Sequence, residues 1–251
     1  MLLNIANPVL VLWKREMIRI WRDKTQLVML VLTPLIMGII GCIIIDYSLY
    51  DDSRLALNAM LILAILINSF TVGSSIVIDK QSGVIKDLLT APVTRAYQIV
   101  SRTLAGSVTS ALTSLLVMVG APLIGVKISL ITVLMLFGAV ILITLTLSTL
   151  SVLIGVLTSS VSGYYSISAF LVLTMLLLSN ALFIVSPNKF SFAGAVLLNP
   201  ALYGSDLTKH ALGLHGDYIA SASITALIGF TIIFGSIAVY LLNRKTGKGD
   251  S

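Results

Sequence analysis

Residues 129–157 read SLITVLMLFGAVILITLTLSTLSVLIGVL and contain no charged side chain. An α-helix needs about 20 consecutive apolar residues to cross the hydrocarbon core of a bilayer, so this run is long enough to span it and to tilt. Similar runs lie on both sides of it. The whole chain is 57% hydrophobic and only 10% charged, against about 25% charged in an ordinary globular domain. The sequence therefore predicts an all-α, polytopic membrane protein.

The apolar runs predict six transmembrane helices in a single domain that covers residues 1–251. Their approximate ranges are 26–45, 55–78, 98–124, 129–157, 166–185 and 218–242. Pro34 predicts a kink in the first span, because neighbouring helices can satisfy the backbone group that a proline frees. The third range is rich in Gly, Ala and Ser, which let helices approach closely, so we expect it in the interior of the bundle.

Residues 8–25 precede the first span and have an amphipathic pattern. Apolar side chains, two of them Trp, fall on one helical face, and five Lys and Arg side chains fall on the other. We predict an interfacial helix with both Trp at headgroup depth and the basic face toward anionic lipid. A plain anchor for the next span is compatible with the same pattern. The candidate interfacial residues are Trp13, Arg15, Glu16, Arg19, Trp21 and Arg22.

Residues 79–95, DKQSGVIKDLLTAPVTR, are the longest polar interruption in the first two-thirds of the chain. Ser82 can cap a short helix there and Pro92 ends it. One face of this helix is an apolar stripe made of Val84, Ile85, Leu88 and Leu89. Such a helix between two spans can dock into a partner protein or lie on lipid headgroups. The residues alone favour neither alternative.

Residues 186–218 form a second irregular region. Two apolar runs, 193–198 and 201–214, are too short to span a bilayer and flank Asn199-Pro200. We predict that they are half-helices that enter the membrane and return on the same side.

The distribution of Lys and Arg predicts the orientation. With the N-terminus inside, twelve of the sixteen basic residues fall on the cytoplasmic side and four on the other. Cytoplasmic loops carry the excess of basic residues. We therefore expect a protein of a prokaryotic cell membrane with both termini in the cytoplasm.

The sequence offers little chemistry of its own. All ten acidic residues lie outside the six predicted spans or at their edges, which argues against an ion-coupled carrier, since such carriers need charges inside the membrane. A phosphate-binding loop of the GxxxxGK[ST] type is absent. His210, His215 and Asp217 match no metal-site spacing well, and Cys42 has no partner for a disulfide. We therefore predict no enzymatic activity, no cofactor and no nucleic-acid partner.

Three motifs together resemble those of ABC-2 type export permeases, including the daunorubicin-resistance-like members. The ending of the 79–95 segment, LLTAPVTR, is similar to the family's LL-x-x-P-[VI]-[ST]-R. The run LLLSNALF at 176–183 is similar to LxLSGxxF. Residues 199–209 are similar to NP-x-x-Y-x-x-D-x-x-R. The chain departs from these patterns at three positions. Gln81 replaces the usual acidic residue, Asn180 the usual Gly, and Lys209 the usual Arg.

The resemblance implies an exporter subunit that dimerises and pairs with two separate ATP-binding cassette subunits, which bind ATP-Mg. Members of the family that the chain resembles export drugs, glycans or lipids. The implied ATPase-coupling residues are Gln81, Gly83, Val84, Ile85, Leu88, Leu89, Pro92 and Arg95. The implied outer half-helix residues are Asn199, Pro200, Tyr203, Asp206 and Lys209. The alternatives are an ion-coupled carrier or channel that works without an ATPase, and a membrane-anchored assembly or immunity factor.

Overall fold

The computed structural model describes residues 8–25, 52–83, 94–181 and 196–247, together with single positions between 28 and 39. Every regular element in these ranges is a helix. The elements are α1 (Pro8–Arg22), α3 (Ser53–Ser69), α4 (Ser74–Gln81), α6 (Arg95–Gly120), η1 (Ala121–Ile124), α7 (Leu130–Leu157), α8 (Val161–Leu177), α10 (Pro200–Ala211) and α11 (Ala220–Gly247). The all-α fold class is confirmed.

Four stretches are helical, apolar and long enough to cross a membrane: Ser53–Gln81, Arg95–Gly120, Leu130–Leu157 and Ala220–Arg244. They correspond to the predicted second, third, fourth and sixth spans. The fifth, α8, is an apolar helix of 17 residues. Most of the first predicted span, 26–45, lies outside the described residues.

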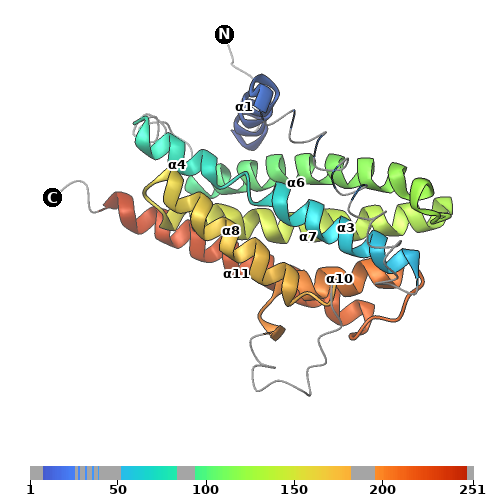
Figure 1. Cartoon of the computed structure of the whole chain (residues 1–251). Coiled ribbons are helices and arrows are strands. Elements are labelled where there is room, and N and C mark those ends of the chain that lie inside the picture. Colours follow the sequence, from blue (N-terminus) through green and yellow to red (C-terminus); the bar gives the residue numbers. More distant parts are fainter. Residues whose placement is uncertain are drawn as a thin grey trace, which may run out of the picture.

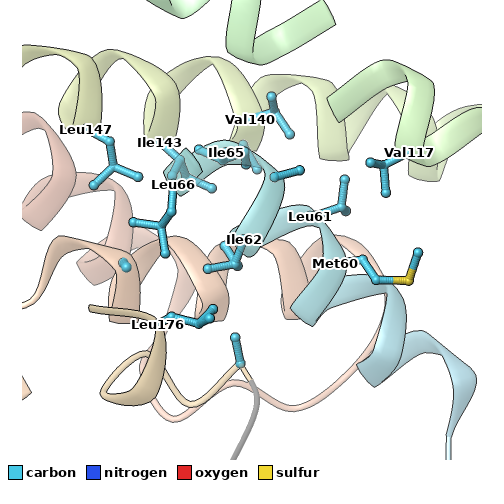
Figure 2. Packing of buried hydrophobic residues seen from close by; sticks show 14 of the residues in the cluster. Met60, Leu61, Ile62, Ile65, Leu66, Val117, Val140, Ile143, Leu147 and Leu176 are labelled. Carbon is cyan, nitrogen blue, oxygen red and sulfur yellow. The ribbon is translucent and has the colours of Figure 1, made fainter. Parts of the chain in front are cut away.

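The long helices run side by side, with α7 packed against α6, α11, α10 and α3 (Figure 1). A large part of the core lies between α3 and α7, where Ile65 and Leu66 of α3 lie beside Val140, Ile143 and Leu147 of α7 (Figure 2). In Figure 1, α4 and the C-terminal end of α11 lie at one end of the bundle, and α10 lies toward the other. We name these the α4 end and the α10 end.

The predicted second span is not one continuous helix, which differs from the expectation for residues 55–78. Helix α3 stops at Ser69 and α4 starts at Ser74. Two groups on neighbouring helices satisfy the backbone freed by the break. The Tyr164 hydroxyl donates to the Phe70 carbonyl, and the Gly73 N–H donates to Ser151 Oγ at 2.9 Å. Without such partners a break at this depth would leave unpaired polar groups in the bilayer.

Gly73 lies where the backbone of the α3–α4 break passes closest to α7. A Cβ atom at Gly73 would stand 2.0 Å from the Ser151 carbonyl oxygen, and one at Gly155 would stand 2.3 Å from the Gly73 carbonyl oxygen. We therefore expect Gly73→Ala to destabilise the protein by at least about 1–3 kcal/mol, the usual cost of overpacking. The thermal midpoint of the purified protein measures this loss.

Gly120→Ala is the matched control, because a Cβ atom at Gly120 would meet nothing within 4 Å. Its midpoint should equal or slightly exceed that of the wild type, since Ala is the better helix former. A Gly73→Ala variant as stable as this control would mean that the two backbones can separate freely.

The fifth predicted span is displaced toward the N-terminus. Residues 161–165 were expected to be a link but are the first turn of α8, because Ser160 Oγ accepts the Gly163 N–H at 3.2 Å and caps the helix. The helix ends at Leu177, and Asn180 follows with a φ angle of 53°. Asn is one of the few non-glycine residues that tolerate this left-handed conformation. This explains why Asn180 can stand where related sequences have Gly.

Candidate functional site

A cluster of charged side chains joins α1, α4 and α6 at the α4 end. Asp79 is its centre. Three guanidinium groups lie near its carboxylate oxygens: Arg102 Nη2 at 2.5 Å, Arg19 Nη1 at 3.3 Å and Arg15 Nη2 at 3.5 Å. A second carboxylate, that of Glu16, lies 3.8 Å from Arg102 Nε and 3.9 Å from Arg19 Nη1. We call these five residues the Asp79 cluster.

The centre of the Asp79 cluster is buried. Asp79, Arg102 and Glu16 are each 5% exposed or less. Arg102 also donates from Nη1 to Ser75 Oγ at 3.0 Å. Taking a charge out of water costs several kcal/mol unless another charge and further hydrogen bonds compensate it. The burial of Asp79 and Arg102 is therefore tolerated only while α1, α4 and α6 stay together.

The residue after Asp79 ties α4 to a fourth helix. Lys80 Nζ donates to three carbonyl oxygens at the C-terminal end of α7, those of Gly155 at 2.7 Å, Val156 at 2.7 Å and Thr158 at 2.9 Å. Helix C-termini leave carbonyl groups unpaired and carry partial negative charge, so an ammonium group is stabilising there. Two adjacent side chains thus connect α4 to α1, α6 and α7.

Helix α1 only partly matches the predicted interfacial helix. Its apolar side packs toward the bundle with Ile20 buried and Trp13 half-buried, whereas Trp21 is 64% exposed. The predicted basic face does not point to lipid throughout, because Arg15 and Arg19 contact the Asp79 carboxylate. Arg22, at the end of the helix, is exposed. Two of the basic side chains therefore have an acidic partner inside the bundle.

The predicted coupling residues lie only in part within the described structure. Gln81 is the last residue of α4, Gly83 follows with a φ angle of 78°, and Arg95 is the first residue of α6. Arg95 Nη1 donates to the carbonyl oxygen of Asn243 at 3.1 Å and to its Oδ1 at 3.2 Å. The predicted coupling residues outside the described structure are Val84, Ile85, Leu88, Leu89 and Pro92. The helices on either side of the predicted coupling segment, α4 and α6, therefore both contact other helices of the bundle.

At the α10 end, the Asn199-Pro200 pair starts helix α10. Asn199 Oδ1 accepts the Ala201 N–H at 3.0 Å, which is the usual N-cap bond, and its Nδ2 donates to the Met175 carbonyl of α8 at 2.9 Å. Pro200 occupies the first turn, where its missing N–H costs nothing. The Tyr203 hydroxyl donates to the Leu197 carbonyl at 3.1 Å. Asn199 thereby fixes both the start of α10 and its contact with α8.

The polar face of α10 is buried in the bundle. Asn58 of α3 donates to Ser205 Oγ at 2.9 Å and accepts a hydrogen bond from the Thr208 hydroxyl. Asp206 and Lys209 are 0% and 7% exposed. The prediction that 201–214 is helical is met over Pro200–Ala211, whereas residues 193–195 lie outside the described structure. Whether α10 enters a membrane stays a prediction.

Sequence reasoning did not identify the Asp79 cluster, because its members are separated by up to 87 positions, between Arg15 and Arg102, and each one alone resembles a solvated residue at the edge of a span. One signal was available. Asp79 and Arg102 lie at the adjoining edges of two consecutive spans and carry opposite charges, so an antiparallel pair of helices brings them together. The described part of the chain holds no group of three His, Cys, Asp or Glu residues that could bind a metal ion.

A bundle of apolar, membrane-length helices with its charged side chains gathered toward its ends defines a polytopic integral membrane protein. The family model of the ABC-2 type transporter matches residues 7–212. The chain therefore belongs to the ABC-2 type transporter family, whose membrane domains are transport permeases rather than enzymes. The match is to the family as a whole and does not distinguish a daunorubicin-resistance-like subtype. No curated protein matches the chain.

Proposed function

We propose that the chain is the membrane subunit of an ATP-binding cassette exporter, that two copies form the translocation pathway, and that two separate cassette ATPases drive it. The observation that carries this proposal is the family match, which includes both the 79–95 segment and the 199–209 motif. The chain has no phosphate-binding loop, so ATP hydrolysis falls to a partner.

The orientation follows from the charges. The α4 end carries the Asp79 cluster, Lys80 and Arg95, and the excess of Lys and Arg in the sequence is on the same side. We infer that the α4 end and both termini face the cytoplasm and that the α10 end faces outward, because cytoplasmic segments carry an excess of Lys and Arg.

The Asp79 cluster supports a route for mechanical coupling. Residues 82–91 are the expected contact with the ATPase, and they begin where α4 ends, two residues after Lys80. Movement of this segment pulls directly on α4. Because Asp79 binds Arg19 and Arg102, and Lys80 binds the end of α7, the displacement passes to α1, α6 and α7 together. We infer that these helices move as one unit when the ATPases close.

Purification of the tagged chain from its native membrane in a mild detergent tests the proposal. We expect a cassette ATPase to co-purify in equal proportion, and vesicles that contain the complex to accumulate cargo only when ATP is present. A chain that purifies alone and moves cargo down an ion gradient would instead support the ion-coupled carrier. That alternative has one observation in its favour, the buried carboxyl group of Asp206.

A further inference from the structure

Asp206 is a buried acid that the transport mechanism above does not use. Its side chain is completely inaccessible to solvent. One oxygen, Oδ1, accepts the backbone N–H of Asp217 at 3.1 Å. The other, Oδ2, is buried and has no hydrogen-bond partner within the described residues. Burying an ionised carboxylate in this setting costs much free energy, whereas burying the neutral, protonated carboxyl group costs far less.

The segment that covers Asp206 is 212–219, between α10 and α11. Three contacts hold its part nearest Asp206: the Asp217 N–H bond to Asp206, a 2.6 Å contact between His210 Nε2 and the Tyr218 carbonyl, and a 2.5 Å bond from Asn180 Nδ2 to Asp217 Oδ2. Gly216 allows the backbone of this segment to pass close to His210, since a Cβ atom at Gly216 would stand 2.9 Å from His210 Nε2. We call this arrangement the 212–219 latch.

The charged surroundings of Asp206 do not neutralise a carboxylate. Within the described residues, Asp206 forms no ion pair with Lys209, one turn further along α10. Helices α7 and α8 contribute no Asp, Glu, Lys, Arg or His, and α11 contributes none before Arg244 at its far end. Arg54 of α3 is occupied by Asp52 at 2.6 Å and by the Leu212 carbonyl at 3.3 Å. The remaining titratable groups nearby are Tyr203, His210, His215, Asp217 and Tyr218.

We propose that Asp206 is a proton-binding site of the permease: it carries a proton on Oδ2 while the 212–219 latch is closed, and loss of that proton to water opens the latch. The protonated acid leaves Oδ1 free to accept the Asp217 N–H, so closure and protonation are compatible. Ionisation places an uncompensated charge under the latch, and the charge is relieved when water reaches it. The proposal does not depend on the presence of an ATPase.

The direction of the pH dependence follows from electrostatics. Asp206 lies outside the four membrane-length helices. Burial, the largest cause, raises the pKa of its carboxyl group, and the Asp217 charge raises it further; together they outweigh the backbone N–H groups of Asp217 and Tyr218 and the Lys209 charge, which lower it. A carboxyl group with a raised pKa in the closed form stabilises that form at pH values below the ordinary aspartate pKa of about 3.9. This stabilisation is lost as the pH rises through the raised value.

The first test is infrared spectroscopy of the full chain in lipid nanodiscs. We expect a carbonyl stretch from a protonated carboxylic acid that persists at pH values where ordinary aspartates are ionised. The stretch should be absent in Asp206→Asn, which preserves shape, and present in Asp52→Asn, which removes an exposed acid. A spectrum without such a stretch, or one that keeps it in Asp206→Asn, overturns the proton site.

The second test measures the latch itself. In a Cys42→Ser background, a cysteine introduced by Leu212→Cys, at the start of the latch, is buried in the core while the latch is closed, whereas one introduced by His215→Cys is exposed. The labelling rate of any thiol rises with pH because the thiolate reacts, so the ratio of the two rates isolates opening. We expect this ratio to rise by up to about tenfold per pH unit from the ordinary aspartate pKa of about 3.9 up to the raised pKa of Asp206, and to level off above it. It should stay constant in Asp206→Asn.

Two results would overturn the latch proposal. A ratio that does not change with pH in the otherwise wild-type chain means that ionisation of Asp206 does not open the segment. A ratio that responds to added Na⁺ or Ca²⁺ at constant pH, and not to pH, means that the carboxylate binds a metal ion. Neither measurement uses ATP or a partner protein. A negative result for the latch therefore does not contradict the proposed exporter function, and a negative result for the exporter function does not contradict the latch.

Discussion

Arg102→Met is expected to lower the free energy of unfolding by about 3–5 kcal/mol, because it leaves buried carboxylates without their closest cation. Arg102 Nη2 lies 2.5 Å from Asp79, and both residues are 4% exposed. Arg15 and Arg19 cannot replace it fully, since they are partly exposed and more distant from the carboxylate. The thermal midpoint of the purified protein in detergent measures the loss.

The Asp52–Arg54 pair at the start of α3 is a control with similar geometry. Its nitrogen and oxygen atoms are 2.6 Å apart, yet the two side chains are 31% and 44% exposed. Water already solvates such a pair, so removing one partner changes stability little. Arg54→Met should therefore lower the midpoint much less than Arg102→Met. Equal decreases in the thermal midpoint for the two variants would show that the buried Asp79–Arg102 pair contributes no more to stability than an exposed pair.

A double variant separates the contribution of the Asp79 cluster to stability from its role in holding α1 against α4. Adding Asp79→Leu to Arg102→Met removes the buried carboxylate that lost its closest cation in the single variant, so part of the stability should return. The link from α1 to α4 should stay broken, because Ile20 is the only buried apolar residue in α1. We expect trypsin to cut α1 faster in the double variant than in the wild type. An α1 that remains fully protected would mean that apolar packing, and not the Asp79 cluster, holds it.

The helices themselves could be predicted from hydropathy, because a bilayer allows few alternatives to an apolar helix. Leu130–Leu157 matches its prediction within one residue at the start. The break at residues 70–73 was not predictable in the same way, since no proline marks it. It exists because Tyr164 and Ser151, which come from later spans, supply the hydrogen bonds that the backbone loses.

The candidate sites show the same division. The motif at 199–209 predicted the start of α10, since Asn199 and Pro200 act on their own neighbours in sequence. The burial of Asp206 depends on α7, α11 and the 212–219 segment, so no local pattern could reveal it. The Asp79 cluster likewise requires the packing of three helices. Both buried charged sites in this chain are formed by residues that are distant in sequence. Hydropathy predicts only the helices that bring these residues together.

Leu88→Asp is the substitution expected to have the largest effect on partner binding. The sequence predicts that Val84, Ile85, Leu88 and Leu89 form one face of a short coupling helix. If that face fills a cleft of the ATPase, each side chain contributes roughly 1.5–3 kcal/mol of apolar burial at most. An aspartate also places an unpaired charge in the interface. A total loss of about 3–4 kcal/mol weakens association by two to three orders of magnitude.

Lys86→Ala is the matched control, because Lys86 falls on the opposite, polar face of the same predicted helix. It should leave recovery of the ATPase close to that of the wild type, while Leu88→Asp should abolish recovery and leave the permease inserted in the membrane. The structure supports normal insertion, since the helices on either side of the segment are held by Lys80 and Arg95 through contacts that do not involve Leu88. A helix that only lies on lipid headgroups would loosen from the membrane without changing any partner's binding. Pull-down of the ATPase decides between the two, and equal recovery with Leu88→Asp and wild type would falsify the coupling-helix assignment.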